Sequence, residues 1–399
     1  MSLFDSKKLF REKLKLQSLF KRSCRGNQMG NCDEKSVYDI VIISRYNPWK
    51  CGGGLENVVK EQIKSVESLG LKIHILYRER IQNVPTIFSD LIYAVLIYLK
   101  ATKINCKILL DNFGFTFLYK FLKGKSRNVV VIKVHHGTSN YLDSYSGIRL
   151  IFAKIYKLFI LKPVCIISSR LADINIVVSC KVKQELINHY KVPPEKVIVI
   201  PNGVNVNMYR PRDKKYIREL LGLPLDKKIV LFVGGDLERK GFWLALNIVK
   251  KVKKYISNIL FVAITSKKYK KRLESLKINW LKILTEVPHN KMPYLYNASD
   301  LLLLPSKYEG LPLTVLEALA SGCPAVVSPN AAEGEYNGQG FLIAHNFEEY
   351  VKYCKKLLTD TEYWMEISSK ARDLAVLRYN IQNQHKLYQE IILKLLKLR

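Results

Sequence analysis

Short runs of β-branched and aliphatic residues alternate with helical segments along most of the chain. The first six runs lie at residues 40–44, 72–77, 107–110, 129–134, 174–179 and 197–200. After a charged stretch the alternation starts again, with runs at residues 229–233, 259–264, 301–304 and 325–328. Strands that alternate with helices predict parallel sheets with helices on both faces. We therefore expect an α/β protein with two doubly wound, Rossmann-like domains.

The two ends of the chain depart from this alternation, because residues 1–36 are basic and polar and helical patterns dominate from residue 347 onward. We predict a basic extension, a first domain, a second domain and a final helix that packs back on the first domain. Their bounds are residues 1–36, 37–208, 209–377 and 378–399. Two such sheets that face each other form a cleft at the carboxyl ends of their strands, and such sheets bind their ligands there.

The charge of the chain favours anionic partners. The 399 residues include 65 Lys and Arg against 34 Asp and Glu, a formal net charge of +31. Such a balance is typical of proteins that bind nucleotides, nucleic acid or acidic lipid. A basic nucleic-acid-binding protein is therefore a rival class. The aromatic residues are not interleaved with basic ones as a stacking platform would require, so we expect a small ligand and no nucleic acid.

The cysteines and the apolar runs indicate the cellular setting. The eight cysteines lie far apart without any Cys-x-x-Cys pair, which argues against a disulfide scaffold and a zinc ribbon. The longest strongly apolar run, residues 91–99, has about half of the roughly 20 residues that a transmembrane helix needs. The amino terminus lacks the continuous apolar stretch of a secretory signal. We expect a cytoplasmic protein without a transmembrane helix.

Several common phosphate-binding signatures are absent. Residues 124–126 read Gly-Lys-Ser, but the glycine that a P-loop needs five residues earlier is Tyr119. No Gly-x-Gly-x-x-Gly follows a strand, and no Asp-x-Asp occurs that would hold a metal and a diphosphate. We therefore expect no metal site.

Glycines and histidines follow two strands of the first domain. Gly53 and Gly54 precede a helix expected to start near Asn57, where free backbone amides suit a diphosphate or a sugar. A flexible surface turn is the alternative. His135 and His136 follow the run at 129–134 and point to opposite sides, so at most one faces the cleft. We favour His136, with a structural histidine as the alternative.

Two loops of the second domain carry charge. After the run at 229–233, Gly234 leads to Arg239 and Lys240 at a helix start, where cations and the helix dipole favour phosphate. After the run at 301–304, Glu309 precedes a helix that we expect to begin near Leu313, and Glu317 lies one turn further. The eight-residue spacing of these carboxylates suits two ends of an extended ligand better than an acid/base pair on one bond. A helix-surface charge is the alternative for Glu317.

These motifs resemble those of the retaining glycosyltransferases of family 4, which have the two-domain GT-B fold. The resemblance covers about residues 38–399, and the element from Glu309 to Glu317 is its most specific part. It implies that a nucleotide-sugar donor lies against the second domain and that an acceptor enters from the first. The donor-binding residues that it implies are Gly53, Gly54, Gly234, Arg239, Lys240, Val287, Glu309, Gly310, Leu311, Pro312, Leu313 and Glu317.

The resemblance also implies individual roles. Arg239 and Lys240 would contact the diphosphate, Glu309 the sugar hydroxyls, Glu317 the ribose, and His136 the sugar near the reacting carbon. Many members have an arginine where this chain has Gly235, so the phosphate charge would rest on the two cations alone. We take these four as catalytic: His136, Arg239, Lys240 and Glu309.

We therefore predict a hexosyltransferase that needs no cofactor and no metal, with a UDP-hexose donor as the commonest case and a glycan or polyprenyl-linked glycan as acceptor. A non-catalytic scaffold of the same fold is a weaker alternative, because both glutamates and the Arg-Lys pair are present.

The basic extension predicts peripheral contact with an anionic membrane. It has eight basic residues before Gly26 against Asp5 and Glu12, and its apolar residues would form two partial stripes on a helix. This pattern fits shallow interfacial binding. A solvated tail is the alternative, and the sequence does not decide between them.

Overall fold

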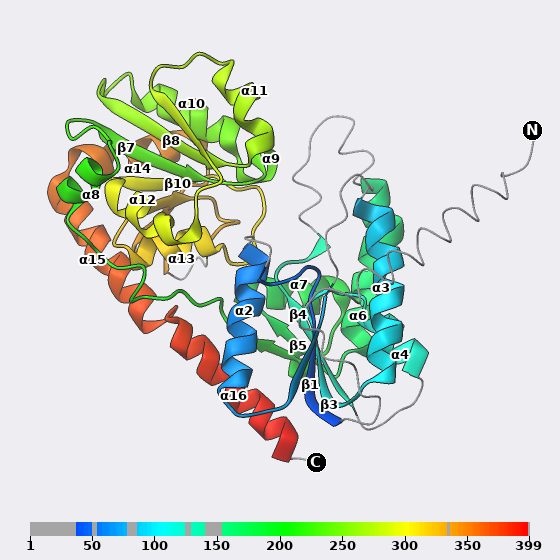
Figure 1. The fold of residues 1–399 in the computed structure, drawn as a ribbon. Helices are drawn as coiled ribbons and strands as arrows, with labels where there is room; N and C mark the ends of the chain where they lie inside the picture. The colour runs from blue at the N-terminus through cyan, green and yellow to red at the C-terminus, as the bar shows by residue number, and fades with distance from the viewer. Residues whose placement is uncertain are drawn as a thin grey trace, which may run out of the picture.

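The computed structural model describes residues 37–49, 54–77, 86–123, 129–139, 154–332 and 336–397. The expectations for the basic extension and for Gly53 lie outside the described residues. The described part has two parallel, six-stranded sheets, each covered by helices, which confirms the predicted α/β class (Figure 1). None of the helices in these ranges is long and apolar enough to cross a membrane.

The first sheet has the strand order β2-β1-β3-β4-β5-β6. Its strands are β1 (Val37–Ile43), β2 (Ile73–Leu76), β3 (Asn105–Asp111), β4 (Val130–His135), β5 (Ile174–Val177) and β6 (Val197–Val199). All six coincide with predicted runs. Its helices are α2 (Gly54–Glu67), α3 (Thr86–Lys103), α4 (Thr116–Lys123), η2 (Lys157–Leu161), α6 (Lys162–Leu171), α7 (Cys180–Tyr190) and η3 (Pro194–Lys196). Figure 1 shows α3, α4 and α6 on the side of the sheet away from α2.

The second sheet has the order β12-β11-β10-β7-β8-β9. Its strands are β7 (Lys228–Val233), β8 (Ile259–Thr265), β9 (Leu281–Thr285), β10 (Leu301–Leu304), β11 (Ala325–Val327) and β12 (Phe341–Ile343). The sequence did not predict β9 and β12, which are the two edges of this sheet. The strand β9 was missed because it is only half-buried and lacks a continuous apolar run.

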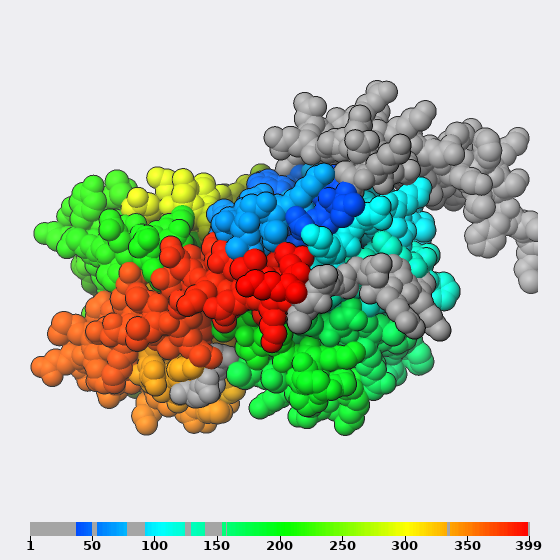
Figure 2. Space-filling view, turned by 90° about the horizontal axis from the view of Figure 1, so that it is seen from below, coloured from blue at the N-terminus to red at the C-terminus, as the bar shows by residue number. Residues whose placement is uncertain are grey.

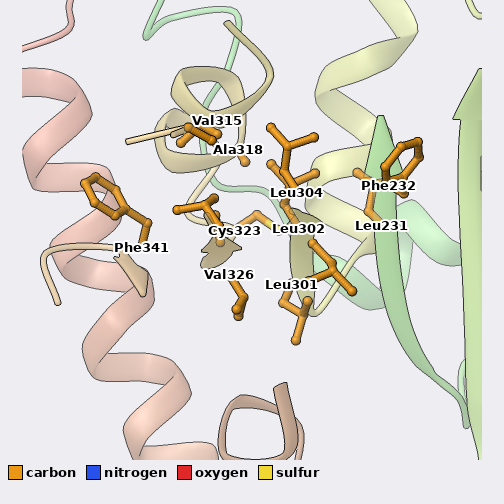
Figure 3. Packing of buried hydrophobic residues seen from close by; sticks show 14 of the residues in the cluster. Leu231, Phe232, Leu301, Leu302, Leu304, Val315, Ala318, Cys323, Val326 and Phe341 are labelled. Atoms are coloured by element: carbon orange, nitrogen blue, oxygen red, sulfur yellow. The ribbon is translucent and has the colours of Figure 1, made fainter. Parts of the chain in front are cut away.

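Helices cover both faces of the second sheet. They are α8 (Lys214–Leu220), α9 (Leu237–Lys240), α10 (Phe242–Val252), η4 (Lys267–Tyr269), α11 (Lys270–Glu274), η5 (His289–Lys291), α12 (Met292–Ala298), α13 (Leu313–Ala320), α14 (Phe347–Thr359) and α15 (Thr361–Leu377). The central strand β10 consists of four fully buried leucines. Figure 3 shows Leu301, Leu302 and Leu304 between β7 and the residues of α13 and β11. A strand buried on both faces is expected to be apolar at every position, as this one is.

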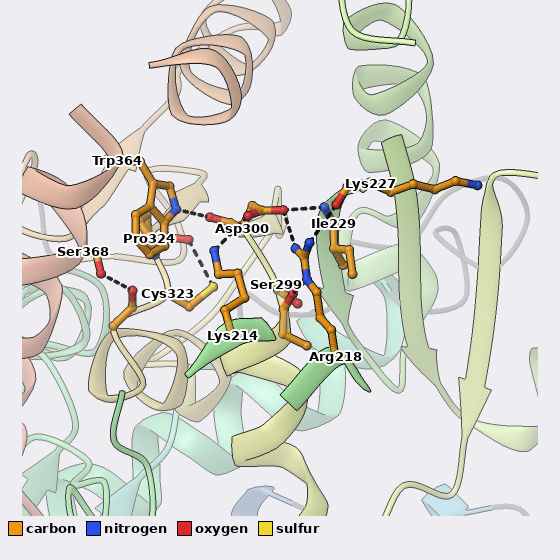
Figure 4. Close-up of polar contacts among 12 residues, drawn as sticks. Lys214, Arg218, Lys227, Ile229, Ser299, Asp300, Cys323, Pro324, Trp364 and Ser368 are labelled. Atoms are coloured by element: carbon orange, nitrogen blue, oxygen red, sulfur yellow. Dashed lines mark hydrogen bonds and ion pairs between the residues drawn. The ribbon is translucent and has the colours of Figure 1, made fainter. Parts of the chain in front are cut away.

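A buried carboxylate fixes the end of β10 that lies away from the cleft. Asp300 accepts bonds of 2.8 Å from Lys214 Nζ and Arg218 Nη2 and a bond of 2.6 Å from the backbone N–H of Ile229 (Figure 4). Burial alone would raise the pKa of Asp300, but the two cations hold it below its ordinary value. Trp364 Nε1 donates to the backbone carbonyl of Asp300. The contacts tie α8, β7 and α15 to the central strand.

The last helix, α16 (Ile381–Lys397), returns to the first sheet and runs beside α2 (Figures 1 and 2). Tyr388 and Ile392 are buried in the core between α2 and the sheet, and Gln62 Nε2 donates to Tyr388 Oη at 2.9 Å. This confirms the predicted returning helix. Where the chain crosses back, Val204 is hydrogen-bonded to the backbone of Tyr379 and Ile381. The two crossings between the halves therefore lie side by side.

Candidate active site

A cleft of about 640 Å³ lies between the two halves at the carboxyl ends of the strands. Loops after β1, β3 and β4 form one side, which we name the N-terminal wall, and loops after β7 and β10 form the other side, the C-terminal wall. The residues of the N-terminal wall include Arg45, Gly54, Leu55, Asn112, Lys133, His135, His136 and Thr138. Those of the C-terminal wall include Gly234, Gly235, Arg239, Lys240, Tyr308, Glu309, Gly310, Leu311, Pro312, Leu313 and Thr314.

The loop after β7 directs two cations toward the cleft. The short helix α9 carries Arg239 and Lys240 and is capped at its N-terminus by Asp236, whose side chain accepts a bond from the N–H of Arg239. A Cβ atom at Gly234 would lie 2.8 Å from Cβ and Cγ of Lys240. Only glycine therefore leaves space for the buried stem of Lys240. Gly241 ends the helix with a φ of 76°, which other residues rarely adopt.

Glu309 joins these cations in one ion-paired cluster. Its Oε1 atom lies 2.8 Å from Arg239 Nη1 and 2.8 Å from Lys240 Nζ. Burial alone would raise the pKa of Glu309, but the two cations lower it, so the carboxylate is ionised at neutral pH. Burial lowers the pKa of Lys240. Three residues that the sequence singled out in two loops thus form one ion-paired group with a net charge of +1.

The helix α13 starts at the cleft, as predicted. It begins at Leu313, and the preceding Pro312 provides no side-chain cap for the first turn. Gly310 lies directly against the other half of the molecule, because a Cβ atom there would come within 2.3 Å of the carbonyl oxygen of His136. Asn202 Nδ2 donates to the carbonyl of Leu311 at 2.8 Å. The loop after β10 is therefore held by both halves.

The two histidines have different partners. His136 is half-buried in the cleft, with Nε2 at 3.0 Å from Asn112 Oδ1, and burial lowers its pKa to about 4. His135 is buried, and its Nε2 lies 2.8 Å from Asn175 Oδ1 on β5. Burial lowers the pKa of His135 well below the ordinary value. Both rings are neutral at pH 7, and each is fixed by a side-chain amide.

Glu317 lies in a smaller cavity of about 280 Å³ that adjoins the cleft. Val58 and Leu313 line both spaces. Tyr296 Oη donates to Glu317 Oε2 at 2.8 Å, and burial raises the pKa of Glu317 to about 7. The two glutamates therefore belong to neighbouring cavities.

Two predicted details differ from the structure. The helix expected near Asn57 already includes Gly54, so this glycine lines the cleft from inside α2 and not from a preceding loop. The helical periodicity of α2 is visible only after Gly54, so the sequence did not show that the first turn begins at this glycine. Val287 lies half-buried between β9 and η5 and lines neither cavity.

Sequence reasoning missed several residues of the N-terminal wall. Arg45 and Asn112 follow β1 and β3 directly, and this position at a strand end is the signal that would have found them. Lys133 stands inside a strand, where a charged residue among aliphatic neighbours was the available signal. Within the described ranges, no group of three or more His, Cys, Asp or Glu residues is placed to hold a metal ion.

Two Rossmann-like halves that face each other across a cleft define the GT-B class of glycosyltransferase folds. Residues 52–208 match the model of Glycosyltransferase Family 4, and residues 213–374 match that of glycosyl transferases group 1. Together the two matches cover most of the chain, one for each half. The chain belongs to this family of two-domain glycosyltransferases.

Similar proteins agree with this membership. A D-inositol 3-phosphate glycosyltransferase of Corynebacterium diphtheriae is 30% identical over 171 residues, which are 39% of this chain and 40% of that protein. The UDP-Gal:alpha-D-GlcNAc-diphosphoundecaprenol alpha-1,3-galactosyltransferase of Escherichia coli is 30% identical over 190 residues, 42% of this chain and 44% of that protein. The matched segments span less than half of these two relatives.

The fold has close counterparts among solved structures. Sucrose-phosphate synthase from Thermosynechococcus elongatus superposes with a TM-score of 0.77 at 17% identity, over 91% of this chain and 100% of that one. At this identity the likeness concerns the fold alone.

Proposed function

We propose that the protein is a retaining glycosyltransferase that moves a hexosyl unit from UDP-hexose to a glycan or lipid-linked glycan. The observation that carries this proposal is the cluster of Glu309, Arg239 and Lys240 beside the start of α13, in a cleft between the two halves. The name of the E. coli relative supports a UDP-linked hexose and a diphospholipid acceptor.

In this proposal the C-terminal wall binds the donor. Arg239 and Lys240 contact the diphosphate, together with the first amides of α13. Glu309 accepts bonds from the sugar hydroxyls and keeps both cations in place. Glu317, in the adjoining cavity, accepts from the ribose. The arrangement of the two glutamates in neighbouring cavities supports one extended ligand that reaches both.

The proposed reaction breaks the bond between the anomeric carbon and the phosphate oxygen, and the nucleoside diphosphate leaves with the electron pair. An acceptor hydroxyl attacks the same face of the sugar, and its proton passes to the departing phosphate. Negative charge grows on the leaving group, so cations fixed in advance lower the barrier. The neutral ring of His136 provides a hydrogen-bonding group beside the sugar. We assign charge neutralisation to the protein's cations and not to a metal.

The net charge of +31 supports an acceptor that is carried by an anionic membrane, with the enzyme at the cytoplasmic face. Contact of residues 1–36 with that membrane stays a prediction.

Transfer assays over a panel of nucleotide sugars test the proposal, each run with Mg²⁺ and with EDTA. We expect UDP release from one UDP-hexose that depends on added acceptor and is equal in both buffers. Absence of turnover with every donor would contradict the enzyme assignment. Loss in EDTA that Mg²⁺ or Mn²⁺ restores would contradict the role given to the protein's cations.

A further inference from the structure

The loop after β10 contacts the start of α7, which belongs to the other half of the molecule. Three consecutive residues of this loop, Tyr308, Glu309 and Gly310, take part. The carbonyl oxygen of Gly310 accepts a bond of 2.9 Å from Ser179 Oγ, at the cap of α7. Lys181 Nζ lies 3.4 Å from the carbonyl oxygen of Glu309 and 4.7 Å from the centre of the Tyr308 ring. The N-terminal half therefore holds the backbone of the loop that carries Glu309.

The hydroxyl of Tyr308 joins a network whose other members belong to the N-terminal half. It accepts a bond of 2.7 Å from the backbone N–H of Thr138 and donates to Glu185 Oε2 at 3.0 Å. Thr138 Oγ1 donates to the same carboxylate oxygen. Tyr308 is 8% exposed, and burial beside Glu185 raises the pKa of its hydroxyl above the ordinary value, so the hydroxyl keeps its proton as a donor. A buried hydroxyl that both donates and accepts is held in one position.

Tyr308 also touches the proposed catalytic groups of both walls. Its backbone carbonyl accepts a bond of 3.0 Å from Arg239 Nη1, the atom that also pairs with Glu309. Its ring lies against Gly137, where a Cβ atom would come within 3.2 Å of the Tyr308 Cε1 atom. Gly137 follows His136 directly in the chain. One residue thus connects the cations of the C-terminal wall with the loop that carries the histidine of the N-terminal wall.

We propose that Tyr308 is a positioning residue for sugar transfer, whose hydroxyl fixes the loop after β10 against the loop that carries His136. Tyr308 acts through Arg239 and Glu309 on one side and through Thr138 on the other, so it needs no contact with the substrate. Groups that approach one reacting carbon from two walls must be aligned to within about 1 Å. This inference rests on the proposed function, because the alignment matters only if both walls serve one reaction.

Tyr190 provides a matched control, because its hydroxyl binds the next residue of the same loop. Tyr190 Oη accepts a bond of 3.0 Å from the backbone N–H of Ser139 and lies 2.9 Å from Ser139 Oγ. Tyr190 is 2% exposed, lies on α7 in the same half as Ser139, and does not line the cleft. Removal of either hydroxyl takes a backbone bond from the loop after β4, but of these two tyrosines Tyr308 alone links that loop to the other half. If Tyr308 merely stabilised the loop, the two phenylalanine variants would behave alike.

Steady-state transfer kinetics and UDP calorimetry on the full-length protein test the inference, with the UDP-hexose that supports turnover as donor. We expect Tyr308→Phe to lower kcat on the order of tenfold or more, because the two walls lose their alignment. Its UDP affinity should stay within about twofold of the wild type, since the cations that contact UDP remain paired with Glu309. Tyr190→Phe should keep both kcat and UDP affinity within about twofold. Equal kcat in the two phenylalanine variants would overturn the inference.

Glu185 tests the same link from the N-terminal half. Glu185→Ala removes the acceptor of the Tyr308 hydroxyl and should lower kcat severalfold, whereas Glu185→Gln retains an oxygen acceptor and should restore most of the turnover. Because both residues act through one network, the double variant Tyr308→Phe with Glu185→Ala should be about as slow as Tyr308→Phe alone. Effects that multiply in the double variant would also overturn the inference.

Small-angle X-ray scattering separates this inference from the proposed function. If the wild type transfers sugar from no donor, the proposed function fails, and the radius of gyration then decides whether Tyr308 links the halves. We expect a larger radius for Tyr308→Phe than for the wild type and Tyr190→Phe, because the halves separate when the link is lost. An equal radius in all three proteins would overturn the link in that case.

Discussion

The two walls of the cleft each carry two cations, but they hold them differently. On the C-terminal wall Arg239 and Lys240 share the carboxylate of Glu309 at 2.8 Å. On the N-terminal wall Lys133 has long contacts to neutral oxygens, and the carboxylate of Asp111 on the adjacent strand raises its pKa against the effect of burial. The cations of the C-terminal wall thus form direct ion pairs inside the cleft, whereas Lys133 is balanced at longer range by a neighbouring strand. A wall of the first kind is organised in advance to hold a charged ligand in one position.

The strongest test of this contrast removes the organised cluster. Glu309→Ala, and separately the pair Arg239→Ala and Lys240→Ala, should each lower transfer by roughly 10²- to 10³-fold, because preorganised charge at the leaving group is lost. The variants should remain folded by circular dichroism. The control is Glu238→Ala on the same helix, whose carboxylate lies outside the cleft and whose loss should leave turnover near that of the wild type. Near wild-type turnover in either cluster variant would refute the site.

A second test adds one methyl group at the point where the two walls touch. In Gly310→Ala the new Cβ atom would meet the carbonyl oxygen of His136 at 2.3 Å, so the loop after β10 must move away from the N-terminal wall. We expect a loss of about 1–3 kcal/mol in unfolding free energy and, since a displacement near 1 Å misaligns the reactants, a fall in kcat of roughly 10²-fold.

Gly235→Ala is the matched control for this substitution. Gly235 lies in the same cleft, and a Cβ atom there would have no neighbour within 4 Å. Its unfolding free energy in urea should equal that of the wild type. Equal unfolding free energies for the two variants would show that the contact between Gly310 and His136 can widen without cost.

The smallest effect concerns the adjoining cavity and is measured as a change in stability with pH. Burial raises the pKa of Glu317 to about 7, whereas the unfolded chain has the ordinary value of 4.5. Between these values the native state binds a proton that the unfolded state lacks, so the stabilising contribution is complete below pH 4.5 and is lost as pH rises through about 7. The loss is on the order of 1–3 kcal/mol.

Urea unfolding of the wild type and of Glu317→Gln at pH 5 and pH 8 measures this loss. The variant should lose less stability between the two values, because its amide does not titrate. A parallel decline of both proteins would place the titrating group elsewhere.

The sequence predicted the parts of the molecule whose signal is local. The strand β10 was visible because a central strand must be apolar throughout, and the start of α13 was visible because Pro312 precedes it. The strand β9 has a weaker pattern, because it is half-buried and lacks a continuous apolar run. The periodicity of single segments therefore predicted most of the fold, including both edges of the first sheet, and missed the two edges of the second sheet.

Contacts between residues far apart in the chain could not be predicted from the sequence. Glu309 and its two cations were each singled out, but the shared oxygen atom joins residues about 70 positions apart. Lys133 was missed because it looks like an interruption within a strand, and its place in the cleft becomes visible only beside residues such as Asn112 that follow another strand. Such assemblies follow from strand order, which periodicity does not determine.

The return of α16 to the first sheet affects how the protein is made. Tyr388 and Ile392 complete the core on the α2 side of that sheet, yet they follow the whole second half in the chain. Residues 200–380 must be synthesised in between, which at about 5–20 residues per second takes on the order of 10–40 s. During that time the nascent first half has all six strands but an uncovered apolar face. Synthesis of the second half and of α16, and not completion of the first sheet, is then the step after which this core can close.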